Sequence, residues 1–131
     1  MANSMLIVED QETMRHVLRE FLQAAFPDET IREAQSAREA LELCRTHPFR
    51  LVLMDVRLPD GNGIDLTAQV KAMLPESAVI VVSQFSAQPY IEGALTAGAA
   101  AYITKDKVYR ELLPTIERQL GLQPMNYAGE R

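Results

Sequence analysis

A single carboxylate ends one of the most apolar runs in the chain. Residues 51–54 read Leu-Val-Leu-Met, Asp55 follows, and the turn-forming residues 58–63 come soon after. A short apolar run bounded by turn residues predicts a strand buried on both faces. A charge is costly to bury there unless it faces water or a cation. We therefore expect Asp55 at the carboxyl edge of a sheet, where open α/β folds place their ligands.

Other predicted strands end in the same way, and the polar residues at their carboxyl ends are Glu9, Asp10, Ser83 and Lys105. Parallel strands all end at one edge, so the five side chains should share a cleft. Carboxylates are the usual protein ligands of Mg²⁺, and a carboxylate can accept a phosphoryl group as a nucleophile. An ammonium and a hydroxyl can bind the phosphoryl oxygens. The set is typical of magnesium-dependent phosphoryl transfer.

Each of these residues also has a structural interpretation when taken alone. Asp10 can cap the helix that follows it, and Glu9 can be a solvated charge. Ser83 can begin a turn, and Lys105 can be an unpaired surface cation. Asp55 fits such an interpretation least, because it follows a buried run directly. The common edge is what favours a site, since chance placement would scatter these groups over both ends of the sheet.

Short apolar runs alternate with segments of helical period along the chain. The predicted strands are residues 5–8, 30–34, 50–55, 79–83 and 101–105. The predicted helices are centred on residues 14–25, 36–47, 64–73, 91–95 and 112–120. Five such repeats indicate a doubly wound parallel sheet covered on both faces, with the flavodoxin-like (βα)5 strand order 2-1-3-4-5. Because proline is unfavourable inside a helix, we expect the regular part of the last helix to start close to Pro114.

The composition is that of one globular domain. The chain has 131 residues, of which 47% are hydrophobic and 24% charged, and a net charge of −5. The negative charge argues against direct binding of nucleic acid, which favours a basic surface. The lone Cys44 cannot form an internal disulfide, and no apolar stretch is long enough to cross a membrane, so we expect a cytoplasmic domain. We assign residues 1–120 to the domain and residues 121–131 to a tail or the start of a linker.

The ordered motifs resemble those of a response-regulator receiver domain of two-component signalling, over roughly residues 4–120. The matching segments are residues 6–10 (Leu-Ile-Val-Glu-Asp), residues 54–61 (Met-Asp-Val-Arg-Leu-Pro-Asp-Gly), the strand that ends at Ser83, and residues 98–105 (Gly-Ala-Ala-Ala-Tyr-Ile-Thr-Lys). Lys105-Asp106, where Lys-Pro is commoner, is similar to the NarL/FixJ group. Members of that group often carry a DNA-binding helix-turn-helix further along the chain.

The resemblance implies a role for each site residue. Asp55 would accept a phosphoryl group from the phosphohistidine of a sensor histidine kinase, and Ser83 and Lys105 would contact that group. Mg²⁺ would be bound by Glu9, Asp10, Asp55 and the backbone carbonyl of Arg57. Ser83 and Tyr102 would move on phosphorylation and change the surface of the fourth helix, fifth strand and fifth helix. The resemblance also allows a homodimer through that surface, and it implies no enzymatic activity beyond the phosphorylation and dephosphorylation of Asp55.

Two hypotheses concern features peculiar to this sequence. Gln84 follows Ser83 where the family usually keeps a small residue, and we expect Gln84, with Arg57 and Phe85, to shield the aspartyl phosphate. The fourth helix offers little apolar area and contains Gly93, so we expect it to have the fastest amide exchange of the five helices.

Three other functions are alternatives to a signalling switch that is phosphorylated on Asp55. A small magnesium phosphatase would usually carry a second acid two residues after its nucleophile, where this chain has Arg57. A receiver fold that is never phosphorylated, acting only through protein contacts, would not need the intact set of acids, hydroxyl and lysine. A flavin-binding protein of the same architecture would need a phosphate-binding loop after the first strand, and no Ser/Thr/Gly-rich loop follows it here.

Overall fold

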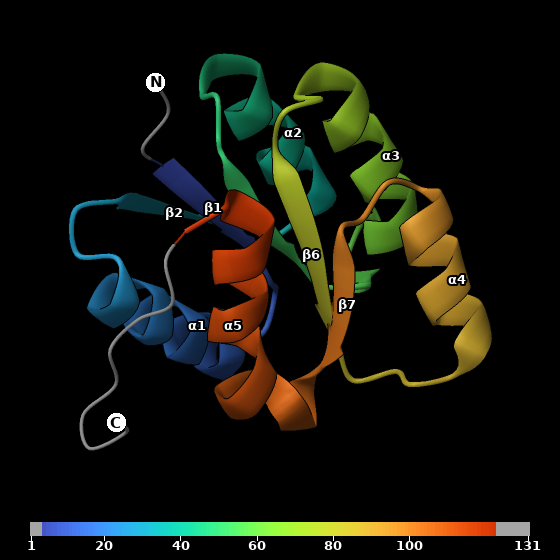
Figure 1. Cartoon of the computed structure of the whole chain (residues 1–131). Helices are drawn as coiled ribbons and strands as arrows, with labels where there is room; N and C mark the ends of the chain where they lie inside the picture. Colours follow the sequence, from blue (N-terminus) through green and yellow to red (C-terminus); the bar gives the residue numbers. More distant parts are fainter. Residues whose placement is uncertain (1–3, 123–131) are drawn as a thin grey trace.

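A computed structural model describes residues 4–122, and residues 123–131 of the predicted tail lie outside the described part of the chain. Its centre is a parallel five-stranded sheet in the order β2-β1-β3-β6-β7 (Figure 1). The strands are β1 (Ser4–Val8), β2 (Thr30–Ala34), β3 (Leu51–Met54), β6 (Ala78–Ser83) and β7 (Ala101–Thr104). Since β6 and β7 are the fourth and fifth strands of this sheet, the predicted flavodoxin-like order is confirmed.

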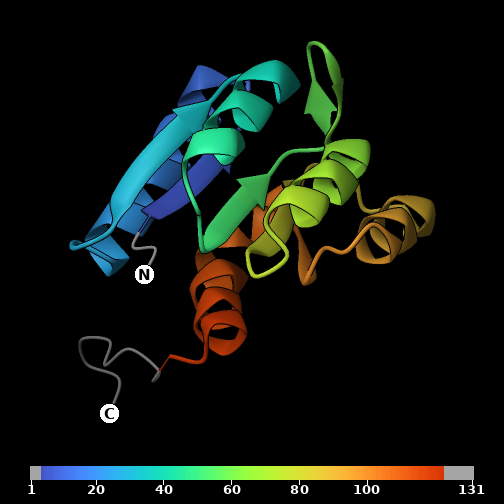
Figure 2. The ribbon, with the colours of Figure 1, turned by 90° about the horizontal axis from the view of Figure 1, so that it is seen from above.

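Helices cover both faces of the sheet, which makes three layers (Figure 2). The five helices are α1 (Glu12–Ala25), α2 (Ala37–Thr46), α3 (Gly63–Met73), α4 (Gln88–Thr96) and α5 (Val108–Leu120). On one face, α1 and α5 pack against the sheet through Leu18, Leu22, Leu112 and Ile116. On the other, α2, α3 and α4 pack through Ala40, Cys44, Leu66, Val70 and Ala94.

The strand residues alternate between these two layers because successive side chains of a strand point to opposite faces. Leu6 and Val52 belong to the layer of α2, α3 and α4. Ile7 and Leu53 belong to the layer of α1 and α5. The continuous apolar runs of the sequence therefore fill two hydrophobic cores, one on each side of the sheet.

The last helix begins earlier than the sequence predicts. Pro114 lies inside α5, which starts at Val108 after a short 3₁₀ helix at Lys105–Lys107. A proline in a helix interior costs about 3 kcal/mol. Burial of Leu112, Leu113 and Ile116 offsets this cost, since each buried side chain of that size contributes about 1.5–3 kcal/mol. The expectation that the helix starts near Pro114 was wrong because packing outweighed local preference.

Two helix ends are stabilised by residues suited to those positions. The Ser36 hydroxyl accepts a 3.1 Å hydrogen bond from the Glu39 N–H and caps α2. Gly98 follows α4 with a φ of 113°, a conformation that glycine adopts without strain. Within residues 4–122, no helix is both long and apolar enough to span a membrane.

Candidate functional site

The carboxyl ends of the strands lie level at one edge of the sheet. Val8 of β1 pairs with Met54 of β3, and Ser83 of β6 pairs with Thr104 of β7. The Asp55 N–H continues the ladder with a 3.0 Å hydrogen bond to the Val8 carbonyl oxygen. The next residues along each strand therefore gather at this edge, which is where the sequence analysis places the site.

Three acids meet there. Glu9, Asp10 and Asp55 each offer a carboxylate oxygen, and these oxygens lie within 4.8 Å of one another. Glu9 is 1% exposed and Asp55 6%, whereas Asp10 is exposed. A group of acids this close and this buried is unstable as a set of free charges, because each raises the energy of the others. All-oxygen ligands of this kind fit a hard cation such as Mg²⁺.

Lys105 partly balances these charges. Its Nζ lies 3.0 Å from Glu9 Oε1 and 3.5 Å from Asp55 Oδ2. Glu9 Oε1 is fully buried. It forms an ion pair with the Lys105 ammonium, but no hydrogen bond of good geometry reaches it from residues 4–122. Two buried carboxylates thus share one protein cation, which leaves negative charge for a further cation to neutralise. The interpretation of Lys105 as an unpaired surface cation is excluded.

The burial of the acids changes their protonation. Desolvation, together with the nearby Asp55 charge, raises the pKa of Glu9 from 4.5 to about 7. Desolvation also raises the pKa of Asp55, although Lys105 opposes this shift. The interpretation of Glu9 as a solvated charge is therefore wrong. Below about pH 7, Glu9 therefore holds a proton in the metal-free fold, and a bound cation would displace it.

The segment after Asp55 is a tight hairpin. Strands β4 (Arg57–Leu58) and β5 (Gly61–Asn62) pair antiparallel, and Asp55 Oδ1 accepts a 2.8 Å hydrogen bond from the Val56 N–H. Helix α3 begins against this turn at Gly63, where a Cβ would lie 1.8 Å from the Asp55 carbonyl oxygen. Only glycine can therefore start α3 this close to Asp55.

A further contact holds the hairpin, and the sequence analysis missed it. The Asp60 carboxylate accepts hydrogen bonds of 2.7 and 3.0 Å from the backbone N–H groups of Ala37 and Arg38, at the start of α2. These bonds hold the pKa of Asp60 below its usual value. Asp60 was visible only as a turn residue, because no local pattern shows that its side chain reaches the N-terminus of a helix 23 residues away.

Ser83 and Tyr102 lie behind the acids. Ser83 is fully buried, and its hydroxyl accepts a 3.0 Å hydrogen bond from the Phe85 N–H. The Tyr102 hydroxyl donates to the Phe85 carbonyl oxygen at 2.7 Å, and burial raises the pKa of this phenol. Both polar groups are thus bound to the backbone of Phe85, in the loop that follows β6. Ser83 does begin a turn, as its structural interpretation proposed.

The Phe85 ring lines one side of the site, and a second ring stacks on it. The Arg57 guanidinium lies 5.1 Å from the centre of the Phe85 ring, a cation–π contact, and Phe85 stacks on Tyr90 of α4 with ring centres 4.7 Å apart. The sequence analysis did not single out Tyr90, since an isolated tyrosine near a helix start carries no signal of its own. The row of rings links the hairpin after Asp55 to α4.

A small cavity opens between the acids and Phe85. It measures about 90 Å³, and its lining residues are Asp10, Gln11, Asp55, Arg57, Gln84, Phe85 and Lys105. A water molecule takes about 30 Å³ in the liquid, so a group larger than one water can enter. Gln84 lies at the mouth as an exposed residue, whereas the buried Ser83 is not part of the lining.

The fold and this site define a class of protein that comparison with known families identifies. Residues 5–117 match the model of the response regulator receiver domain. The chain belongs to the response-regulator receiver family. Receiver domains bind Mg²⁺ in an acidic pocket, and the group of Glu9, Asp10 and Asp55 corresponds to such a pocket.

Curated relatives agree with this assignment. The chain is 35% identical over 105 residues to the chemotaxis protein CheY of Halobacterium salinarum, an alignment that covers 80% of this chain and 86% of CheY. It is 36% identical to the polar-differentiation response regulator DivK of Brucella ovis, with 92% and 98% covered. It is 37% identical to the transcriptional regulatory protein PdtaR of Mycobacterium tuberculosis, with 86% of this chain covered but only 54% of PdtaR. The match thus spans about half the length of PdtaR.

Experimental structures show the same fold. A CheY-like receiver domain protein from Methanospirillum hungatei superposes with a TM-score of 0.83 at 29% identity, with 92% of this chain and 95% of that chain covered. A two-component response regulator of the LuxR family from Aurantimonas superposes with a TM-score of 0.83 at 25% identity, with 95% and 90% covered.

Proposed function

We propose that the chain is a phosphorylation-activated switch in which Asp55 accepts a phosphoryl group from the phosphohistidine of a sensor histidine kinase. One observation carries the proposal: the Asp55 and Glu9 carboxylates share the Lys105 ammonium beside a cavity open to solvent. Of these three groups, only Asp55 is a buried carboxylate that also lines the cavity, so a phosphoryl donor can reach it. Membership of the receiver family supports a histidine kinase as the donor.

The residues that would hold Mg²⁺ are Glu9, Asp10, Asp55 and, through its backbone carbonyl, Arg57. When bound, the ion neutralises the acids and offers sites for phosphoryl oxygens. Below about pH 7, Glu9 must lose its proton before both carboxylates can act as ligands. The hairpin of β4 and β5, which Asp60 attaches to α2, fixes the backbone of Arg57 beside them.

In the transfer step, an Asp55 carboxylate oxygen forms a bond to phosphorus while the P–N bond to the donor imidazole breaks. The electron pair of that bond stays on the imidazole nitrogen. The Lys105 ammonium stabilises the negative charge on the phosphoryl oxygens. In the deactivating step, which is hydrolysis, water attacks phosphorus and the P–O bond to Asp55 breaks. The Asp55 carboxylate is regenerated and inorganic phosphate is released. The chain therefore acts on its own aspartate and not on external substrates.

The switch would run through the loop after β6. A phosphoryl oxygen on Asp55 would accept a hydrogen bond from the Ser83 O–H, while Ser83 Oγ can still accept the Phe85 N–H, so a turn of Ser83 toward the phosphoryl group would carry this loop with it. Movement of this loop also breaks or shifts the hydrogen bond from Tyr102 to the Phe85 carbonyl. Since Phe85 stacks on Tyr90 of α4, the change would reach the surface formed by α4, β7 and α5.

The output of the switch is transcriptional in our proposal, as the regulatory part of a longer NarL/FixJ-type protein. Lys105-Asp106, the LuxR-family structure and the relative PdtaR support this. Residues 1–120 would then be the receiver domain and residues 121–131 a tail or the start of a linker. A homodimer through the surface of α4, β7 and α5 would carry the signal, and the negatively charged domain itself would not bind DNA.

The decisive experiment is incubation with acetyl phosphate and Mg²⁺, followed by mass measurement of the intact protein. We expect a phosphate-sized gain that disappears with EDTA and in Asp55→Asn, and that persists in the control Asp65→Asn, which alters an exposed acid on α3. No mass gain in the wild type would favour a module that works only through protein contacts. Repeated turnover of small phosphoesters would favour a phosphatase.

A further inference from the structure

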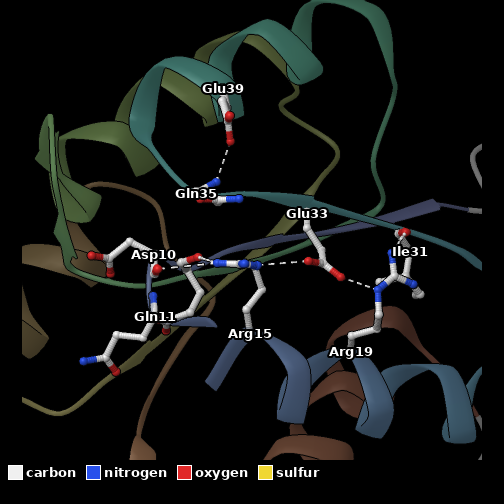
Figure 3. Close-up of polar contacts among 9 residues, drawn as sticks. Asp10, Gln11, Arg15, Arg19, Ile31, Glu33, Gln35 and Glu39 are labelled. Carbon is white, nitrogen blue, oxygen red and sulfur yellow. Dashed lines mark hydrogen bonds and ion pairs between the residues drawn. The ribbon is translucent and has the colours of Figure 1, made fainter. Parts of the chain in front are cut away.

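One arginine reaches the acidic turn from the first helix. Arg15 of α1 donates from Nη1 to the carbonyl oxygen of Glu9 at 3.0 Å and to that of Asp10 at 3.4 Å. Its side chain is only 11% exposed. Figure 3 shows the Arg15 guanidinium lying between Asp10 on one side and Glu33 of β2 on the other. Arg15 therefore binds the two peptide carbonyls that lie directly beside two of the three acids.

The other end of the Arg15 fork is held by an acid on the neighbouring strand. Glu33 Oε1 accepts a 3.0 Å hydrogen bond from Arg15 Nε, and Glu33 Oε2 accepts one from Arg19 Nε. Burial alone would raise the pKa of Glu33, but the hydrogen bonds and charges of Arg19 and Arg15 hold it below its usual value. Glu33 is thus ionised at neutral pH and neutralises the Arg15 charge.

Arg19, on the same helix, can be compared directly with Arg15. It binds the same Glu33 carboxylate and donates to the Ile31 carbonyl oxygen at 2.7 Å, one turn further along α1 (Figure 3). Unlike Arg15, it makes no hydrogen bond or ion pair with Glu9 or Asp10 within residues 4–122. The two arginines therefore share an anchor but differ in whether they reach the acidic turn.

The sheet alone does not fix this turn. The Glu9 N–H still belongs to the ladder, with a 3.0 Å hydrogen bond to the Ala34 carbonyl oxygen, but the Glu9 and Asp10 carbonyls lie beyond the end of β1. Asp10 is exposed, and no donor within residues 4–122 holds its carboxylate. The direction of that carboxylate depends on the backbone, which two side chains bind there: Glu9 Oε2 accepts a 3.1 Å hydrogen bond from the Gln11 N–H, and Arg15 binds the Glu9 and Asp10 carbonyls.

We propose that Arg15 is a positioning residue for the cation site: by joining the Glu9 and Asp10 carbonyls to Glu33, it fixes the turn that presents two of the three acidic ligands. This inference rests on the proposed function, since it assumes that these acids bind Mg²⁺. Groups that orient metal ligands without touching the metal typically affect affinity by about 10- to 100-fold when removed.

The test measures Mg²⁺ binding alone, by isothermal titration calorimetry, in the wild type and in Arg15→Gln, Arg15→Lys and Arg19→Gln. We expect the Kd for Mg²⁺ to rise about tenfold in both Arg15 variants and to stay unchanged in Arg19→Gln. Arg15→Lys keeps the charge but lacks the fork that spans the turn and Glu33. An effect of charge alone would leave Arg15→Lys like the wild type and would make Arg15→Gln bind Mg²⁺ more tightly.

Urea denaturation and backbone amide NMR spectra of each variant accompany the titrations. Both arginines bind Glu33, so Arg19→Gln shows what a general loss of stability does to Mg²⁺ binding. We also expect the amide shifts of residues 9–11 to change in Arg15→Lys and not in Arg19→Gln. Wild-type Mg²⁺ binding with an unchanged Kd in both Arg15 variants would overturn the role of Arg15. Absence of Mg²⁺ binding in the wild type would instead overturn the proposed function.

Discussion

The Tyr102 hydroxyl donates a 2.7 Å hydrogen bond to the carbonyl oxygen of Phe85, which ties β7 to the loop that follows β6. We expect Tyr102→Phe to lower the free energy of unfolding by about 1 kcal/mol, the usual net contribution of one hydrogen bond. Amide exchange in residues 84–87 should become faster because the loop loses this attachment. Urea denaturation and hydrogen exchange followed by NMR measure the two effects.

Tyr90→Phe is the matched control for this prediction. It also removes one tyrosine hydroxyl but keeps the ring that stacks on Phe85. We expect exchange in residues 84–87 to remain as in the wild type. Equal acceleration in the two variants would show that the Tyr102 hydrogen bond does not hold the loop.

The protonation of Glu9 predicts a pH dependence of the metal-free protein. Its pKa is about 7 in the folded state and near the ordinary 4.5 in the unfolded chain. The folded state therefore binds more protons between these values, and the free energy of unfolding should fall as the pH rises from about 4.5 to about 7. The contribution of Glu9 is fully present below this range and is lost as the pH passes the folded-state pKa.

Urea denaturation in EDTA at several pH values measures this effect, with Glu9→Gln as the control that cannot ionise. We expect the difference in stability between the two proteins to change across the range, to the disadvantage of the wild type at higher pH. Mg²⁺ should stabilise the wild type more at about pH 8 than at about pH 5, because the carboxylates must lose their proton to bind it. Parallel curves for wild type and Glu9→Gln would contradict the raised pKa.

Gly63 should tolerate no side chain. A Cβ at this position would lie 1.8 Å from the Asp55 carbonyl oxygen, and backbone cannot move aside as a side-chain end can. We expect Gly63→Ala to destabilise the fold by about 3 kcal/mol, at the upper end for overpacked sites. In Gly61→Ala, two residues earlier, the new Cβ would meet the Ala37 side chain at an ordinary 3.5 Å. A similar loss of stability in both variants, by urea denaturation, would show that the clash with Asp55 is not the cause.

Helix α4 should exchange its amide protons faster than α5. Its only fully buried side chain is Ala94, whereas α5 buries Leu112, Leu113 and Ile116 among others. Local opening costs least where little apolar surface is exposed by it. Hydrogen exchange of the unphosphorylated protein measures this difference, and equal protection of α4 and α5 would argue against α4 as the part that rearranges.

Gln84 should slow the release of phosphate. It lies exposed at the mouth of the cavity that contains Asp55 and Lys105. We expect Gln84→Ala to lose phosphate several-fold faster than the wild type after loading with acetyl phosphate, because water reaches the phosphorus more easily. The control is Gln88→Ala, at the start of α4 and outside the lining of this cavity. An unchanged or slower rate in Gln84→Ala would reject shielding by this residue.

The sequence predicted most of the fold because its apolar runs are short, continuous and evenly spaced. Parallel strands buried on both faces require such runs, and the polar residues that end them then fall at one edge of the sheet. Pro114 misled the analysis because local preference does not report how much apolar surface its neighbours bury. Residues that act through long-range contacts gave no local signal, as Arg15 and Asp60 show.

The two separate hydrophobic cores have a consequence for how the protein tolerates change. Cys44 and Leu112 lie on opposite sides of the sheet and belong to clusters that share no member. Truncations at two such distant positions should add in their effects on stability, with little interaction energy between them. The side of the sheet that carries α4 can thus accumulate substitutions that adapt its outer surface to new partners, while the side formed by α1 and α5 keeps its packing intact.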